Sequence, residues 1–250
     1  MSTVRPAAIL VAARDEEERI AGTLERLREQ FPGAAIVVAD DGSHDATAAV
    51  AEAAGAAVVR LPRRGKGQAL TLAERACPPG ALLLCDADVE GDLRPLLGDA
   101  HASLAVASFA RRSGGGFGIA KRVARRLIRA RTGYEAGEPL SGQRLLDERG
   151  RAASFPVAAG FGVETRMTID VLRAGLRVAE HRLELGHRPT GRDVPGFAHR
   201  GRQLGDLLLA CGPQGVNHRG LRLPLVGWVV GLVVPAVAPV AAVGLLDDLW

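Results

Sequence analysis

The sequence predicts an α/β fold with a mostly parallel central sheet and helices on both faces. Two observations predict it. Short apolar runs of strand length alternate with segments of helical periodicity in the first half of the chain, and turns rich in Asp and Gly follow several of those runs. Strands of a parallel sheet are typically continuous apolar runs, and ligands gather at their carboxyl ends. The 250 residues are enough for one large domain of this class.

The first predicted strand covers residues 7–13 (AAILVAA), because an unbroken apolar run of this length is typical of a buried strand. A helix is predicted over residues 15–31, with acidic residues in its first turn, where the helix dipole favours them. One face of that helix is apolar, with Ile20, Leu24, Leu27 and Phe31 at helical spacing. The order continues with a strand at 34–40, a helix from Asp45 to a stop at Gly55, a strand at 56–61, a helix at 65–76 and a strand at 81–88.

The second half of the chain begins with a basic segment. Residues 111–131 contain eight Lys or Arg and no acid, with a triple glycine near the start. A further helix is predicted near 163–174 and a strand near 176–185. We interpret the basic segment either as a surface for an acceptor phosphate or an anionic membrane, or as a solvated helix face.

Charge is divided unevenly along the chain. Residues 1–110 contain 11 basic and 16 acidic side chains, whereas residues 111–250 contain 21 basic and 12 acidic ones. This division favours a cation site in the first half and an anionic partner for the second. Aromatic residues, which stack on bases, make up only 4% of the chain, so nucleic acid is not the expected partner. The three cysteines lack metal-site or disulfide-framework spacing, which favours a reduced setting.

Residues 223–246 contain no charged side chain, and this length matches the roughly 20 residues that cross a bilayer. Basic residues precede the segment and Asp247 and Asp248 follow it, so the positive-inside tendency predicts a catalytic domain at the cytoplasmic face of the cell membrane. The predicted organisation is therefore a catalytic domain at 1–200, a basic linker at 201–222 and a membrane segment. The alternative is a buried hairpin or core helix in a cytoplasmic protein.

Three motifs lie at the carboxyl ends of predicted strands: AARDEEE after the first, ADDGSHDAT after the second and CDADVEG after the fourth. Together with RGKGQAL, LSGQRLL and GFGVETRMTID, they resemble the motifs of the family 2 glycosyltransferases. The resemblance implies the GT-A fold, which binds nucleotide sugars. Within that family the chain is similar to the dolichol- and polyprenyl-phosphate sugar synthases and to the glucosyl-3-phosphoglycerate synthases.

The resemblance implies a metal site at the end of the fourth strand. Asp88 is the first candidate ligand and Asp86 the second, and Asp86 can instead meet the ribose. Their carboxylate oxygens suit Mg²⁺ or Mn²⁺, with the donor diphosphate and water completing the coordination. Such a cation would neutralise the charge that grows on the diphosphate as the sugar leaves.

The nucleotide itself is expected to contact the loops after the first two strands. Ala13, Arg14 and Glu16 would flank the base, and Asp40 and Asp41 would accept hydrogen bonds from the base and ribose. Arg14 stands where the family usually has Asn, which leaves the identity of the base open. Lys66 lies between two glycines, which let the backbone approach the nucleotide while the ammonium supplies a point charge.

Acceptor-side residues follow from the later motifs. Gln143 and Arg144 of SGQR resemble the acceptor segment of the polyprenyl-phosphate enzymes. Glu164 of GFGVE and His187 resemble the pocket acid and third metal ligand of the phosphoglycerate enzymes. The middle region offers no clear acid pair to deprotonate a neutral hydroxyl, whereas a phosphate is already ionised, so a phosphorylated acceptor is expected.

The main hypothesis is thus a metal-dependent hexosyltransferase that uses a nucleotide-diphosphate sugar and polyprenyl phosphate. A soluble enzyme of the glucosyl-3-phosphoglycerate synthase kind is one alternative. A non-catalytic nucleotide-sugar-binding membrane anchor is another. The sequence leaves open the sugar, the base, the stereochemistry and the oligomeric state.

Overall fold

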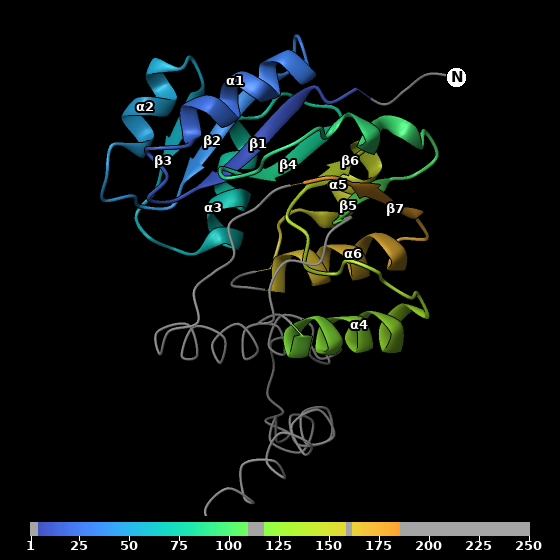
Figure 1. Cartoon of the computed structure of the whole chain (residues 1–250). Helices are drawn as coiled ribbons and strands as arrows, with labels where there is room; N and C mark the ends of the chain where they lie inside the picture. The colour runs from blue at the N-terminus through green and yellow to red at the C-terminus, as the bar shows by residue number, and fades with distance from the viewer. Residues whose placement is uncertain (1–4, 110–117, 159–161, 186–250) are drawn as a thin grey trace, which may run out of the picture.

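The computed structural model of the protein describes residues 5–109, 118–158 and 162–185, and it forms one seven-stranded sheet covered by helices on both faces (Figure 1). The predicted fold class is confirmed. The strands are β1 (Ala8–Ala13), β2 (Ala35–Asp40), β3 (Ala57–Arg60), β4 (Leu82–Asp86), β5 (Leu104–Phe109), β6 (Arg144–Leu146) and β7 (Val178–Leu183). The helices are α1 (Ile20–Gln30), α2 (Thr47–Ala53), α3 (Lys66–Ala73), α4 (Gly118–Thr132), α5 (Glu148–Ser154) and α6 (Val163–Arg173), with short 3₁₀ turns η1 (Glu74–Ala76) and η2 (Arg94–Gly98).

The strand order is β3-β2-β1-β4-β6-β5-β7. Strands β1 to β4 are parallel, β6 runs antiparallel to both β4 and β5, and β5 is parallel to β7. In register, Ala13 of β1 pairs with Asp40 of β2, and Ala12 pairs with Asp86 of β4. The last residues of β1, β2 and β4 therefore meet at one edge of the sheet, which is where their acidic side chains gather.

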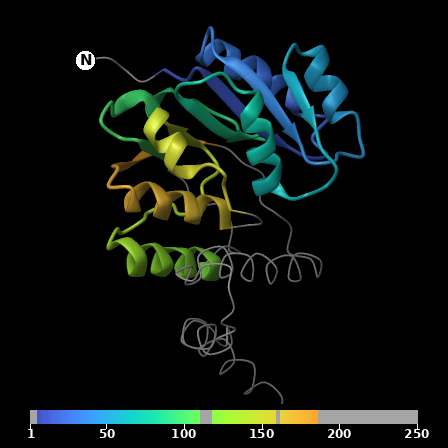
Figure 2. The same ribbon diagram turned by 180° about the vertical axis from the view of Figure 1, so that it is seen from behind.

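The two faces of the sheet carry separate apolar cores. On one face, Leu24 and Leu27 of α1 pack with β1 and β2 residues such as Val11 and Val38. On the other face, α3 and α6 pack over Leu84 of β4 and its neighbours. Helix α4 covers α6 from outside and makes a further layer, so the helices below the sheet are two deep there (Figures 1 and 2).

The first helix begins later than predicted. The expected acidic first turn is wrong, because α1 starts at Ile20 and has no acid in its first turn. Glu16 and Glu17 lie in the preceding loop, where their backbone amides donate to side chains of the loop after β2 instead of starting a helix. The predicted basic helix within residues 111–131 is described from Gly118 onward.

In the described part of the chain, no helix is both long and apolar enough to cross a membrane. The predicted membrane segment at 223–246 and the basic linker at 201–222 lie outside the described residues.

Gly67, in the first turn of α3, tests how tightly this helix packs against Ala158 and the start of α6. A Cβ there would overlap the carbonyl oxygen of Ala158 and lie 3.0 Å from a methyl carbon of Val163. We expect Gly67→Ala to lower the free energy of unfolding by about 1–3 kcal/mol, as overpacking does, measured by urea denaturation.

The matched control is Gly22→Ala in α1, where the added Cβ meets only the end of the flexible Arg26 side chain. It is expected to be neutral or stabilising; equal losses in both variants would contradict the packing argument.

Candidate functional site

The loops after β1 and β2 are joined by hydrogen bonds in both directions. The Asp15 amide donates to Ser43 Oγ (3.0 Å) and the Glu16 amide to Thr47 Oγ1 (2.7 Å). In return, the His44 amide donates to Asp15 Oδ1 (2.7 Å). That amide is the main reason why the pKa of Asp15 is lowered, so its carboxylate is charged at neutral pH. Asp15 has a φ of 54°, which is uncommon for a residue with a side chain.

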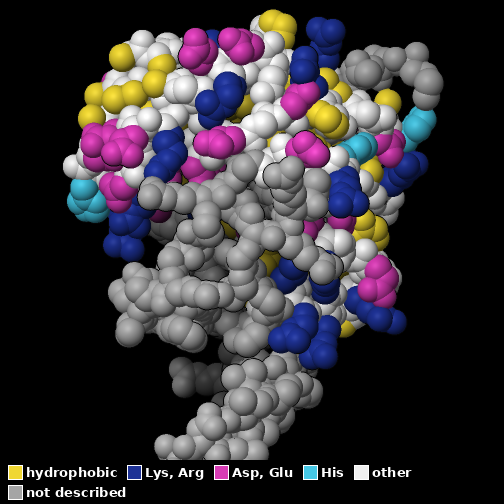
Figure 3. Space-filling model, viewed as in Figure 1, with side chains coloured by type: hydrophobic (Ala, Val, Ile, Leu, Met, Phe, Trp, Pro, Cys, Tyr) yellow, Lys and Arg dark blue, Asp and Glu magenta, His cyan; other side chains and the backbone are white. Residues whose placement is uncertain are grey.

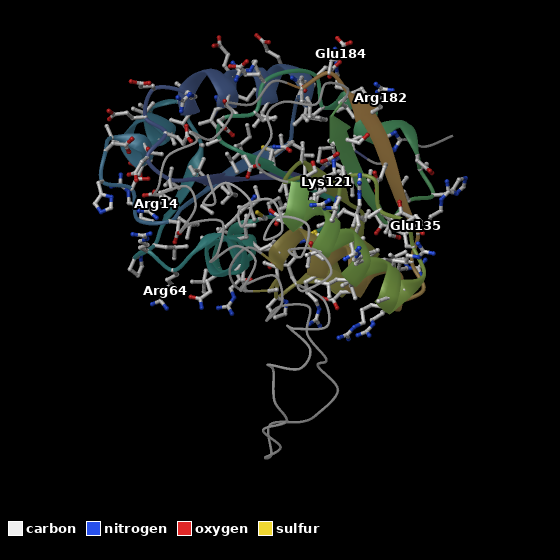
Figure 4. All side chains as sticks on the ribbon, turned by 60° about the horizontal axis from the view of Figure 1, so that its bottom comes forward. Arg14, Arg64, Lys121, Glu135, Arg182 and Glu184 are labelled. Atoms are coloured by element: carbon white, nitrogen blue, oxygen red, sulfur yellow. The ribbon has the colours of Figure 1, made fainter. Side chains whose placement is uncertain are left out.

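This pairing of loops positions three of the residues predicted to meet the nucleotide. The Ala13 carbonyl accepts a hydrogen bond from the Asp41 amide at 3.1 Å. Arg14 is about one-third exposed, and its Nε lies 3.4 Å from Asp15 Oδ2. Glu16 forms an ion pair with Arg19 at 2.7 Å. The backbone of this segment is thus fixed, and Arg14 reaches out from it on the same side of the molecule as Arg64, as Figure 4 shows.

The two acids at the end of β2, Asp40 and Asp41, accept hydrogen bonds that fix the conformation of nearby loops. Asp40 accepts hydrogen bonds from the amide (3.1 Å) and hydroxyl of Ser43. The carboxylate of Asp41 accepts from the amides of Arg64 (2.7 Å) and Gly65 (2.9 Å). Both acids are buried. Asp41 therefore fixes the start of α3, and with it the place of the next residue, Lys66.

Lys66 joins two carboxylates that lie far apart in the sequence, Asp86 and Glu164. Its Nζ lies 2.7 Å from Asp86 Oδ1, at the end of β4, and 2.8 Å from Glu164 Oε1, in the first turn of α6. Burial by itself would lower the pKa of Lys66, but the two carboxylates outweigh it and raise that pKa above its ordinary value. The ammonium is thus held charged as the internal cation of the cluster.

Gln143, the residue directly before β6, is the fourth member of this cluster. Its Nε2 donates to Asp86 Oδ2 at 3.1 Å, and its Oε1 accepts from Ser141 Oγ at 3.3 Å. The neighbouring Gly142 is needed because a Cβ there would overlap the Asp86 carboxylate. A small, mostly apolar pocket lies beside the cluster, and Lys66, Glu164 and side chains from β4 and α6 line it.

Arg144 is fully buried, at 1% exposure, although sequence reasoning placed it toward the acceptor. Its guanidinium donates to the carbonyls of Ser141 (2.7 Å) and Pro139 (3.2 Å) and to Thr168 Oγ1 (2.9 Å). Burial lowers the pKa of Arg144 to about 10, with Glu164 opposing that effect. The side chain ties the turn that carries Gln143 to α6, and in this structure it is a positioning residue.

Asp88 lies two residues beyond β4 and is half-buried. The pKa of Arg19 is raised chiefly by its hydrogen bond with Glu16, and to a smaller extent by the charges of Glu18 and Asp88, so Asp88 lies in the neighbourhood of Arg19. The described residues contain no group of three or more His, Cys, Asp or Glu arranged to hold a metal. Two carboxylates at a strand end fit a Mg²⁺ or Mn²⁺ ion that a substrate diphosphate helps to coordinate. His187, predicted as a third ligand, lies outside the described residues.

Residues 8–158 match the sequence profile of glycosyl transferase family 2. The chain belongs to this family. It is therefore a glycosyltransferase, as the resemblance of its motifs predicted. The match begins with β1 and ends beyond α5, so it includes Asp86, Lys66 and Gln143 of the cluster.

Curated relatives of this glycosyltransferase include glycosyltransferase AglJ of Haloferax volcanii, 28% identical over 78% of this chain and 67% of the relative. A glucosyl-3-phosphoglycerate synthase of Mycolicibacterium paratuberculosis is 32% identical over 71% of this chain and 66% of the relative. The chain thus spans about two thirds of the length of these relatives.

Among solved structures, the glucosyl-3-phosphoglycerate synthase of Mycobacterium tuberculosis in complex with phosphoglyceric acid is 28% identical, with a TM-score of 0.67, over 87% of this chain and 85% of that one. The same synthase in complex with Mn²⁺, uridine diphosphate and phosphoglyceric acid has a TM-score of 0.67 at 29% identity, over 84% of this chain and 80% of that one.

Proposed function

We propose that this glycosyltransferase moves a sugar from a nucleotide-diphosphate donor to a phosphorylated acceptor and uses Mg²⁺ or Mn²⁺. The observation that supports this most is the cluster of Lys66 with Asp86 and Glu164 at the edge where β1, β2 and β4 end. The structurally similar synthase was crystallised with uridine diphosphate and Mn²⁺ or Mg²⁺, which supports the same donor class and cation here.

The roles of the residues follow from the charge that the reaction creates. The bond between the sugar and the diphosphate breaks, and negative charge grows on the leaving oxygen. A divalent cation held by Asp88, and by Asp86 when Lys66 releases it, would neutralise that charge. Lys66 would offer its ammonium to the same anion, and Glu164 would face the sugar ring. The fixed loops after β1 and β2 would bind the base and ribose through Arg14 and the backbone.

Two phosphorylated acceptors have support. The similar synthase was crystallised with phosphoglyceric acid and with glycerol 3-phosphate, which favours a small phosphorylated acceptor. The uncharged residues 223–246 favour polyprenyl phosphate and a catalytic domain at the cytoplasmic face of a membrane. Either acceptor presents an ionised oxygen or an adjacent anionic group, which charged hydrogen-bond donors of the site could bind.

The test is a donor screen that measures release of the nucleotide diphosphate. The full chain is incubated with uridine, guanosine and other nucleotide-diphosphate sugars, with Mn²⁺, Mg²⁺ or a chelator, and with 3-phosphoglycerate or polyprenyl phosphate in detergent. We expect release that depends on both the cation and one acceptor. Release only with 3-phosphoglycerate would exclude polyprenyl phosphate as the acceptor. Release only with polyprenyl phosphate would exclude the small phosphorylated acceptor. A folded protein that releases nucleotide from no donor would overturn the proposal.

A further inference from the structure

Helix α4 is amphipathic and uses only one of its faces to bind the rest of the domain. Val123, Ala124, Leu127 and Ile128 are buried, and they pack with Ile169 of α6 in one apolar cluster. The opposite face carries no acid. The basic residues of the helix are Lys121, Arg122, Arg125, Arg126, Arg129 and Arg131. An apolar stripe buried against α6 thus turns a row of cations outward.

Part of this charge is satisfied within the described protein. Lys121 forms an ion pair with Glu138. Arg125 donates to the Ala136 carbonyl at 3.0 Å. Arg129 pairs with Glu135 at 2.9 Å, but both side chains are 69% exposed, so water screens that pair. Figure 4 shows Lys121 and Glu135 beside α4.

Arg122 and Arg126 remain without an ion pair or side-chain hydrogen bond to any residue that the structure describes. Both are exposed, and their spacing of four residues puts them on one face of the helix. Figure 3 shows dark-blue Lys and Arg side chains gathered over α4 at the lower right. With Arg125 and Arg129 between and beyond them, these residues form what we call the α4 basic face.

The positive charge of this face would attract an anionic partner, and three features favour a lipid surface over other anions. The face is one straight helix that lies on the outside of the molecule (Figure 2), which suits a flat partner. It has none of the aromatic side chains that stack on nucleic-acid bases. The α6 helix lies between it and the sheet, so a small substrate phosphate at the Lys66 cluster would not reach it.

We propose that the α4 basic face docks on the surface of an anionic phospholipid bilayer. This goes beyond the proposed transfer reaction, because it names a surface outside the catalytic cluster and does not depend on which acceptor is used. Docking has a geometric consequence, since α4 packs directly on α6 and the first turn of α6 carries Glu164. The lipid surface and the catalytic cluster would then be separated by two helix layers, α4 and α6, each about 10 Å thick.

The test is flotation of the full chain with vesicles of phosphatidylcholine alone or with about 30% phosphatidylglycerol, a composition that gives the surface a negative potential. The native chain is expected to prefer the anionic vesicles, and the preference should fall as salt rises. In Arg122→Gln/Arg126→Gln, we expect the preference to drop by about 30-fold, from about 1 kcal/mol for each basic residue at such a surface. Comparing the two vesicle types cancels any contribution of residues 223–246 that does not depend on lipid charge.

The matched control is Arg5→Gln/Arg149→Gln, which removes the same net charge from exposed positions outside α4. It should keep most of the preference for anionic lipid. An equal loss in the control would mean that net charge alone drives binding and would overturn the proposal, as would an equal affinity of the native chain for both vesicles. If Arg122→Gln/Arg126→Gln instead raised the KM for a soluble phosphorylated acceptor and left flotation unchanged, the face would belong to the acceptor and the proposal would fail.

Discussion

Replacing Asp88 with asparagine is expected to lower the rate of sugar transfer at least about 100-fold while the protein stays folded. Loss of even an outer partner of a metal ligand costs about 10- to 100-fold in metal affinity, and Asp88 is proposed to touch the metal itself. Asp88 lies two residues past the end of β4, so the substitution does not disturb the strand pairing of Asp86 with Ala12. The measurements are kcat for transfer and the Mn²⁺ concentration that gives half-maximal rate.

Asp92→Asn is the matched control for this prediction. Asp92 lies four residues further along the same loop, has a side chain that is 46% exposed and pairs with Arg94 at 2.8 Å. Removing its charge should change kcat by less than about twofold, because exposed pairs contribute little. If the two variants lost activity equally, Asp88 would have no special role, and a different carboxylate would have to hold the metal.

Replacing Lys66 with methionine is expected to have the next largest effect, and it should change two properties in opposite directions. Transfer should fall about 100-fold, because the donor anion loses a preorganised positive charge. Binding of Mn²⁺ to the protein without nucleotide should become tighter, because Asp86 and Glu164 lose the internal cation that now neutralises them. The rate is measured with saturating donor, and Mn²⁺ binding is measured by titration of the free protein.

The second lysine of the chain provides the control for Lys66. Lys121 also pairs with a carboxylate, that of Glu138, but it lies on α4 away from the sheet edge. Lys121→Met should leave transfer to a soluble acceptor and Mn²⁺ binding nearly unchanged. If Lys66→Met weakened Mn²⁺ binding, Lys66 would be shaping the metal site instead of competing with it, and the role proposed above would be wrong.

The first half of the fold could be predicted because β1, β2 and β4 are buried and read as apolar runs, and the edge strand β3, although only partly buried, is also largely apolar. Strands β1 to β4 lie within one or two residues of their predicted positions. The short strand β6 could not be predicted, because it has three residues, begins with Arg144 and pairs antiparallel with both neighbours. The direction of β6 is not set by its own residues. It is set by hydrogen bonding to β4 on one side and β5 on the other.

The sequence predicts which residues lie near the site better than it predicts the contacts between them. Carboxylates at the ends of parallel strands meet because the strands share an edge, so the neighbourhood of Asp86 follows from the sequence. The ion pair of Lys66 with Glu164 joins residues 98 positions apart and depends on how α3 and α6 lie beside each other. The family resemblance indicated each residue but not this contact. The sequence likewise predicts Arg144 beside the acceptor, because its burial depends on a long-range contact with Thr168 of α6 that no local pattern indicates.

The hydrogen bonds that run both ways between the loops after β1 and β2 make these two loops a single structural unit. The hydroxyls of Ser43 and Thr47 accept backbone amides of the loop after β1. The carboxylate of Asp15 accepts the His44 amide in return. Loss of any of these three side chains therefore leaves a backbone amide of the other segment without its partner. Neither loop can be exchanged alone without leaving amides unpaired. An engineer who wishes to give this enzyme a different nucleotide donor should therefore transplant both loops together.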